Sequence, residues 1–302
     1  LLGVTKMFEI CIHGRGGQGA VMAAQALASA AYHGGNFAIA FPHFGAERRG
    51  APVLAFVRID TQPIGIRSHV YEADCVIVLD DSLLEYVNVI EGLKDGGKVI
   101  INSNKNPEQI HLEKQIEITV VDATKIALKN LGMPVTNTSI LGAVPRVIPI
   151  FSIDSICRGI KNIFSIKFSE EMINKNINAV IEAYNSTRHG RSGTTKKFNQ
   201  KKKWLPPYTD MPIGGNLKTI KTSEGLIGPG SFIENKTGSW KTFAPVVDEK
   251  KCTFCQICWF FCPEGCIIRK EKSIKIDYDY CKGCGICAEE CPTKAIELKI
   301  EN

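Results

Sequence analysis

No run of 18 apolar residues occurs in the 302-residue sequence, and its start lacks a charged stretch followed by a long apolar one. We therefore expect neither a membrane span nor a secretory signal peptide. Four of the 12 cysteines, Cys11, Cys75, Cys157 and Cys266, lie far apart, without the pattern of a disulfide scaffold. This distribution is typical of a reducing compartment, so we expect a cytoplasmic protein.

The other eight cysteines form two runs with the spacing Cys-x2-Cys-x2-Cys-x3-Cys-Pro, offset by 29 residues. This spacing is typical of bacterial ferredoxins with two [4Fe-4S] clusters, in which the fourth cysteine of each run binds the other cluster. We therefore assign the ligands in two quartets: Cys252, Cys255, Cys258 and Cys291 for cluster 1, and Cys281, Cys284, Cys287 and Cys262 for cluster 2.

A structural zinc site is the main alternative, but zinc uses four ligands that usually come as two separated pairs. Two interlocked quartets, each closed by proline, favour iron-sulfur clusters and one-electron chemistry. Cys266 is a ninth cysteine in this region, and its equivalent in the second run is Ala295. We interpret Cys266 as a small buried apolar residue rather than a ligand or redox thiol, because free cysteine is often buried.

Length and an ordinary globular composition, 44% hydrophobic and 23% charged, indicate two domains and a connector. We expect an α/β domain over residues 1–190, a basic and then Pro/Gly-rich connector over 191–245, and an α+β ferredoxin domain over 246–302. Seven Lys and Arg residues between 188 and 203 are accompanied by no acid and supply much of the net charge of +6. Without a nucleic-acid-binding fold beside it, this basic segment is expected to be a linker or a docking surface for an acidic protein.

The N-terminal region alternates strand and helix patterns. Strands are expected at 8–13, 53–59, 75–79, 98–101 and 116–121, and helices at 20–33, 82–91, 123–131 and 169–184. The alternation favours an α/β fold with a mostly parallel sheet and helices on both faces. Asp80 and Asp81 follow a strand, where capping of the next helix by Asp81 or Ser82 is the favoured role.

A glycine loop, Gly14–Gly19, lies between the first strand and the first helix. Its sequence GRGGQG matches G-x-G-x-x-G at Gly14, Gly16 and Gly19. Such a loop at a helix N-terminus can hold a phosphate or carboxylate. A dinucleotide site also needs an acid about 20 residues further on, and residues 33–41 contain none. The pattern therefore favours a tight turn, open to an anion, over a nicotinamide site.

Residues 204–245 are rich in Pro and Gly and show little periodicity. We expect an extended arm packed over partners, because Trp204, Phe232, Trp240 and Phe243 are too many aromatic residues for a free linker.

The chain resembles two subunits of 2-oxoacid:ferredoxin oxidoreductases. Four segments together resemble the gamma subunit: Gly14–Gly19, Phe44–Pro52 (FGAERRGAP), Val57–Ile59 and Asn137–Gly142. The tail from about Gly238 through both cysteine runs resembles the delta subunit. Each motif alone is modest, but their order on one polypeptide is specific.

The resemblance implies a fused gamma-delta, electron-transfer subunit of a thiamine diphosphate-dependent enzyme that oxidises pyruvate or oxalate with CO2 release. Alpha-type and beta-type partners would hold thiamine diphosphate, Mg2+ and a further [4Fe-4S] cluster, in a dimer of heterotrimers. External ferredoxin would accept the electrons, and neither nucleic acid nor membrane is expected as a partner. The sequence has no Gly-Asp-Gly followed by paired Asn to hold the diphosphate, so we assign no catalytic residue.

The family also suggests that the gamma-type domain covers the active site or binds coenzyme A. The natural anion contacts would then be Gly14, Gly16, Gly17, Gly19, Arg48 and Arg49. A fused gamma-delta chain also resembles oxalate oxidoreductase, which needs no coenzyme A, so substrate and coenzyme stay open. The alternative from another class is an NAD-linked iron-sulfur reductase subunit that uses the Gly14–Gly19 loop.

Overall fold

In the computed structural model, the chain forms two compact units, residues 1–198 and 199–302. The structure describes residues 7–43, 50–85, 87–194, 220–222, 225–227, 233 and 236–300. Within these ranges, no helix is both long and apolar enough to cross a membrane. Each unit has its own hydrophobic core.

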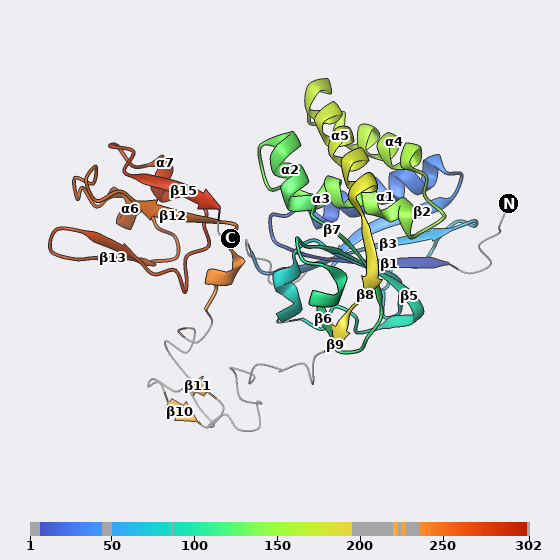
Figure 1. Ribbon diagram of the computed structural model, residues 1–302, viewed down its shortest axis with the longest axis horizontal. Helices are drawn as coiled ribbons and strands as arrows, with labels where there is room; N and C mark the ends of the chain where they lie inside the picture. Colours follow the sequence, from blue (N-terminus) through green and yellow to red (C-terminus); the bar gives the residue numbers. More distant parts are fainter. Residues whose placement is uncertain are drawn as a thin grey trace. The chain divides into compact units, whose positions relative to one another are not determined.

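A seven-stranded sheet forms the centre of the first unit (Figure 1). Its strands are β1 (Phe8–Arg15), β2 (Phe37–His43), β3 (Pro52–Asp60), β4 (Ala73–Val78), β5 (Leu93–Asn102), β7 (Glu117–Val121) and β8 (Arg188–Arg191), in the order β2-β3-β1-β4-β5-β7-β8. The neighbours β1, β4, β5 and β7 pair in parallel, whereas β3 and β8 run antiparallel to their neighbours. The expected mostly parallel sheet is confirmed. A short parallel pair joins β6 (His111–Leu112) to β9 (Gly193–Thr194).

The α-helices described in the first unit pack on one face of this sheet. They are α1 (Ala20–His33), α2 (Ala123–Leu131), α3 (Thr136–Ser139), α4 (Ile153–Phe164) and α5 (Glu170–Ser186). Their buried side chains form one core with strand residues such as Ile12 and Ile77. The other face, with Cys11 and Val76, is covered by irregular connections and short 3-10 segments that bury residues such as Ile90. The expectation of helices on both faces is therefore wrong.

The expected helices at 20–33, 123–131 and 169–184 form, and local signals explain their ends. Helix α1 stops where Gly34 N–H donates to the carbonyl of Ala30 at 3.0 Å. Helix α2 is capped at its N-terminus by Asp122, whose carboxylate accepts from Lys125 N–H at 2.9 Å, and at its C-terminus by Gly132 with φ of 71°. Helix α5 is capped by the Ser169 hydroxyl. Such caps depend only on residues within a few positions of the helix end, so they can be predicted from the sequence alone.

The predicted helix at 82–91 does not form. A 3-10 turn, η1 (Asp81–Glu85), is followed by irregular chain and then by β5. Gly92 has φ of 73°, and a Cβ at this residue would overlap the carbonyl oxygen of Tyr71. Val89 and Ile90 are buried against the sheet all the same. The spacing of these apolar residues therefore indicates that they are buried. It does not distinguish an amphipathic helix from an irregular connection, because both can bury residues in this way.

Two further 3-10 segments complete the first unit. The segment η2 (Pro107–Gln109) lies between β5 and β6, and η3 (Ile140–Arg146) continues directly from α3. The residues from Thr136 to Val144 are all buried, so the Asn137 segment is part of the core rather than an exposed loop.

The second unit contains an internal repeat. Its elements are β12 (Phe243–Val247), α6 (Ile257–Phe260) and β13 (Ile267–Arg269), then β14 (Ile274–Ile276), α7 (Ile286–Glu289) and β15 (Ile296–Ile300). Strand β12 pairs with β15, and β13 with β14, both antiparallel. The first strand of each half therefore pairs with the last strand of the other half. Before the repeat, β10 (Ile220–Thr222) pairs with β11 (Gly225–Ile227), and η6 (Gly238–Trp240) forms one turn.

Part of the predicted basic segment belongs to the sheet. Arg188 begins the edge strand β8, and its guanidinium donates to the carbonyl of Ser103 at 3.1 Å and to Asn106 Oδ1 at 2.9 Å. Arg188 is therefore a structural residue, and interpreting it as part of a linker was wrong. Other expected features lie outside the described residues: Arg48, Arg49, the lysines at 196–203, Trp204 and Phe232.

Candidate functional site

The glycine loop connects β1 to α1 in a tight turn. Gly17 and Gly19 have φ of 95° and 80°, in the left-handed region that glycine adopts without strain. Gly16 exchanges backbone hydrogen bonds with its neighbours across the loop, donating to Ala51 at 2.8 Å and accepting from Gly50 at 2.9 Å. A Cβ at Gly19 would clash with the side chain of Asn137. Close packing against the helix layer is therefore one reason for glycine here.

The loop is held by a carboxylate from the next parallel strand. Arg15 is 2% exposed, and its Nε lies 3.1 Å from Asp80 Oδ2, while Gln18 Nε2 donates to the same oxygen at 2.8 Å. Arg15 also donates to Ser82 Oγ at 2.7 Å and to the carbonyl of Gly50 at 3.2 Å. Asp80 therefore binds the loop, whereas capping by Asp81 or Ser82 had been expected. Asp81 instead accepts from Ser103 Oγ at 2.6 Å.

These polar residues lie at the carboxyl ends of β1, β4 and β5, where open α/β sheets place ligands. Asn102, at the end of β5, donates to the carbonyl of Leu79 and to Thr124 Oγ1, both at 2.9 Å. The expected contacts Gly14, Gly16, Gly17 and Gly19 all belong to this edge. Because Asp80 already satisfies Arg15 and Gln18, an external anion here would meet backbone N–H groups rather than the Arg15 side chain.

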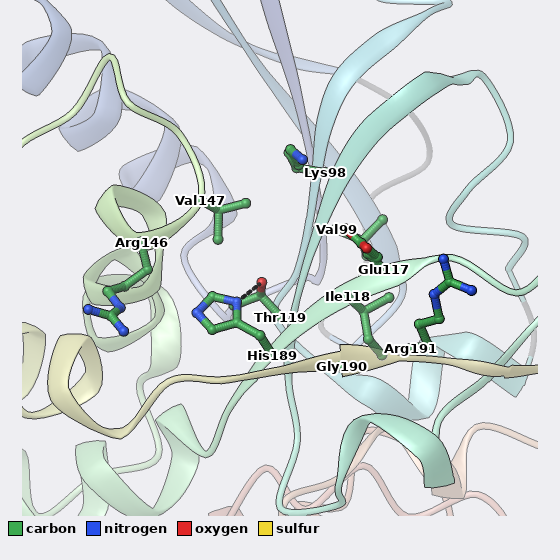
Figure 2. Close-up of a pocket in the computed structure, with 10 residues that line it drawn as sticks. All are labelled: Lys98, Val99, Glu117, Ile118, Thr119, Arg146, Val147, His189, Gly190 and Arg191. Atoms are coloured by element: carbon green, nitrogen blue, oxygen red, sulfur yellow. Dashed lines mark hydrogen bonds between the residues drawn. The ribbon is translucent and has the colours of Figure 1, made fainter.

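A separate hollow of about 430 Å³ lies over β5, β7 and β8 (Figure 2). Lys98, Arg146 and Arg191 line it together with Glu117, and none of these side chains is ion-paired within the described part of the chain. At its base, the buried Thr119 hydroxyl is hydrogen-bonded to a ring nitrogen of His189 at 3.0 Å (Figure 2). The charged groups are exposed and spread around the rim. This is an open basic surface rather than an enclosed ligand cavity, and the sequence did not reveal it.

The cysteine region repeats its backbone geometry as well as its sequence. Residues with positive φ occur in equivalent pairs: Phe254 (54°) with Gly283 (61°), Gln256 (65°) with Gly285 (86°), and Gly265 (61°) with Lys294 (50°). Single-turn helices α6 and α7 are also equivalent and contain Cys258 and Cys287. The same chain path is therefore built twice, with glycine at some left-handed positions and strained side chains at the others.

The two halves are interlocked at the cysteines. Asp248 N–H donates to the carbonyl of Ala295 at 2.7 Å, and Asp277 N–H donates to that of Cys266 at 2.8 Å. In each half, a residue shortly before the cysteine run is therefore hydrogen-bonded to the end of the other half. Such an arrangement brings the fourth cysteine of one run next to the first three of the other, as exchange of the fourth ligand requires.

The cysteines of the first proposed quartet lie close enough to change the pKa of one of their members. Burial raises the pKa of Cys258, and the neighbouring thiols of Cys255, Cys252 and Cys291 raise it further. Cys258 and Cys291 are buried, whereas Cys255 is exposed. Cys291 Sγ accepts a hydrogen bond from Ala295 N–H at 3.2 Å.

The second proposed quartet behaves in the same way. Burial raises the pKa of Cys287 to about 12, with contributions from Cys281, Cys284, Cys262 and, from the other quartet, Cys258. The second quartet also lines one small cavity of about 20 Å³.

The residues present fit iron-sulfur clusters, because six of the eight cysteines of the two runs belong to one hydrophobic cluster. Cysteine thiolates are the ligands that hold [4Fe-4S] clusters. Cys266 is buried as expected, but it also lies 3.5 Å from Cys262, sulfur to sulfur.

The α/β unit and the doubled cysteine repeat together define an iron-sulfur redox protein with a separate α/β domain. Residues 9–186 match the family model "Pyruvate ferredoxin/flavodoxin oxidoreductase", and residues 274–297 match "4Fe-4S binding domain". The chain belongs to the pyruvate ferredoxin/flavodoxin oxidoreductase family, which is a family of oxidoreductases.

Individual relatives agree with the family. The chain is 52% identical over 185 residues to the common gamma subunit of pyruvate/ketoisovalerate oxidoreductases from Thermococcus kodakarensis, covering 60% of this chain and 97% of the relative. It is 51% identical to pyruvate synthase subunit PorC from Methanocaldococcus jannaschii, covering 59% and 96%. The crystal structure of pyruvate oxidoreductase subunit PORC from Thermotoga maritima matches with a TM-score of 0.51 and 35% identity, covering 62% and 99%. The expected gamma-type resemblance is confirmed, and this chain extends beyond these relatives.

Proposed function

We propose that the chain is a fused gamma-delta, electron-transfer subunit of a thiamine diphosphate-dependent 2-oxoacid:ferredoxin oxidoreductase. The observation that carries this proposal is the union, on one polypeptide, of a family-matched α/β unit and an interlocked repeat with eight cysteines. The gamma-type part would be residues 1–190, the connector 191–245 and the ferredoxin domain 246–302. Catalytic thiamine diphosphate and Mg2+ would belong to partner subunits, which would carry a further [4Fe-4S] cluster.

Two [4Fe-4S] clusters would be held by the two cysteine quartets. Bound clusters accept and release one electron at a time, with potentials set by charge, burial and hydrogen bonds to sulfur. The chain supplies part of this environment itself: Ala295 N–H donates to Cys291 Sγ, and Lys282 bridges to Glu264 at 2.9 Å beside the second quartet. External ferredoxin would be the acceptor, in a cytoplasmic complex of two heterotrimers.

Pyruvate is the substrate that we favour. One relative is named for both pyruvate and ketoisovalerate and another for pyruvate alone, and their identities to this chain are 52% over 185 residues and 51% over 179 residues. Oxalate is the second candidate, because a fused gamma-delta chain resembles that enzyme too. Coenzyme A would lie at the loop of Gly14, Gly16, Gly17 and Gly19, in which the Gly16 N–H is already donated to Ala51, with Arg48 and Arg49 as further contacts.

Anaerobic purification of the complete complex tests the proposal. The chain should contain eight iron atoms and co-purify with the subunits that bind thiamine diphosphate. Its clusters should be bleached by pyruvate only when coenzyme A is present, and NADH should not reduce them. If oxalate bleached the clusters without coenzyme A, the α/β unit would have only an architectural role. Rapid bleaching by NADH alone would instead support the nicotinamide-linked alternative at the Gly14–Gly19 loop.

A further inference from the structure

Cys266 lies among the ligands of the second quartet without belonging to either cysteine run. It is 5% exposed, and its sulfur is 3.5 Å from that of Cys262. It lines the same cavity as Cys262, Cys281, Cys284 and Cys287. Cys266 therefore contacts one side chain, and shares a cavity with three others, that the proposed function assigns to one cluster.

The direction of this hydrogen bond follows from ligation. A cysteine bound to iron is a thiolate and has no proton to give. If Cys262 is a ligand, Cys266 is the partner that carries a hydrogen, so its S–H donates to Cys262.

The internal repeat provides a built-in comparison. The residue equivalent to Cys266 is Ala295, which has the same place before the last strand of its half and is likewise buried, at 2% exposed. The carbonyls of both residues accept equivalent hydrogen bonds, from Asp277 and Asp248. Since the backbone is the same, the side chain at this position distinguishes the two quartets: a thiol donor at one and a methyl group at the other.

We propose that Cys266 is a positioning residue that raises the reduction potential of the cluster held by Cys262, Cys281, Cys284 and Cys287. Reduction adds negative charge to a cluster and its sulfur ligands, so a donor aimed at those sulfurs stabilises the reduced form. The other quartet has a methyl group at this position, Ala295, and its own side-chain donor is the Thr293 hydroxyl, 3.7 Å from Cys291 Sγ. The inference rests on the proposed function, which supplies the two clusters.

The test is an anaerobic potentiometric titration of the complete protein, followed by electron paramagnetic resonance of the reduced clusters. Cys266→Ala should make one of the two one-electron steps harder by about tenfold in the reduced-to-oxidised ratio, about 59 mV, and leave the other step unchanged. Cys266→Ser keeps a donor and should recover much of the shift. Cys157→Ala makes the same chemical change in the first unit and should change neither step.

Each outcome decides the proposal. Unchanged potentials in Cys266→Ala would overturn it, and so would a Ser variant that behaves as the Ala variant does, because packing rather than donation would then matter. Loss of four iron atoms in Cys266→Ala would also overturn it, since Cys266 would then be a ligand. A wild-type protein without iron would overturn the proposed function itself, a result that iron analysis separates from the others.

Discussion

Arg15 and Asp80 are 65 residues apart in the sequence and form an ion pair of 3.1 Å that holds the glycine loop against the carboxyl end of β4. Arg15 is almost fully buried, and its other donors are used by Ser82 and the Gly50 carbonyl. A buried guanidinium needs a counterion because desolvation of its charge is otherwise uncompensated. The pair therefore fixes the loop that the family resemblance had singled out for ligand binding.

Asp80→Asn should destabilise the first unit, because it leaves the Arg15 charge buried without a counterion. We expect a loss of about 2–3 kcal/mol in unfolding free energy, at the low end for buried pairs because the Asp80 side chain is 21% exposed. The control is Asp154→Asn, which breaks an exposed i,i+4 pair with Arg158 and should cost under about 0.5 kcal/mol. Urea unfolding monitored by circular dichroism compares them. Equal losses would show that Arg15 does not depend on Asp80.

Gly19→Ala should destabilise the protein more than Gly35→Ala. Both glycines have φ near 80°, so both alanine variants carry the left-handed penalty of about 1–2 kcal/mol. A Cβ at Gly19 also meets the amide of Asn137, whereas a Cβ at Gly35 has nothing within 4 Å. The difference should be about 1–3 kcal/mol, as in overpacked cores. Thermal unfolding of the two variants measures it, and equal melting temperatures would contradict the packing argument.

Most of the first unit could be predicted because its signals are local. The alanine periodicity of α1 and the glycines after it define that helix within the sequence itself. The helix at 82–91 could not be judged in this way, because the apolar spacing around Val89 and Ile90 reflects contact with the sheet and not the backbone conformation. The Arg15–Asp80 pair was missed for a related reason: no local pattern reports a partner 65 residues away.

Lys294→Gly should stabilise the cysteine repeat, since it relieves a side chain held at φ of 50°. The expected gain is about 1 kcal/mol, offset slightly by the loss of the bond from Lys294 Nζ to the Glu289 carbonyl. Gly265→Ala is the reciprocal variant at the equivalent position and should lose about as much, because no atom lies within 4 Å of its Cβ. Anaerobic thermal unfolding compares the pair, and shifts of the same sign would refute the strain assignment.

His13 should make the first unit less stable in mild acid. Burial lowers the pKa of His13 to about 4, so the folded state keeps the ring neutral while the unfolded chain binds a proton below about pH 6.5. Stability is therefore full above pH 6.5 and falls by about 3 kcal/mol as pH drops toward 4, the energy of a shift of roughly 2.5 pKa units. His13→Asn removes the titrating group. Its urea midpoint should vary less between pH 7 and pH 5 than that of the wild type, and parallel profiles would exclude His13 as the cause.

Cys258→Ala and Cys287→Ala should each remove one cluster and weaken the other, because the proposed fourth ligand of each quartet comes from the opposite run. The pairing of β12 with β15 and β13 with β14 joins the halves in the same crossed manner, so loss of one cluster loosens both. Cys157→Ala replaces a half-buried cysteine of the first unit and should leave the iron content unchanged. Iron analysis and visible absorbance of anaerobically purified protein give the result. Eight iron atoms in either cluster variant would show that the ligand assignment is wrong, whereas four with a second cluster as stable as in the wild type would show that the halves are independent.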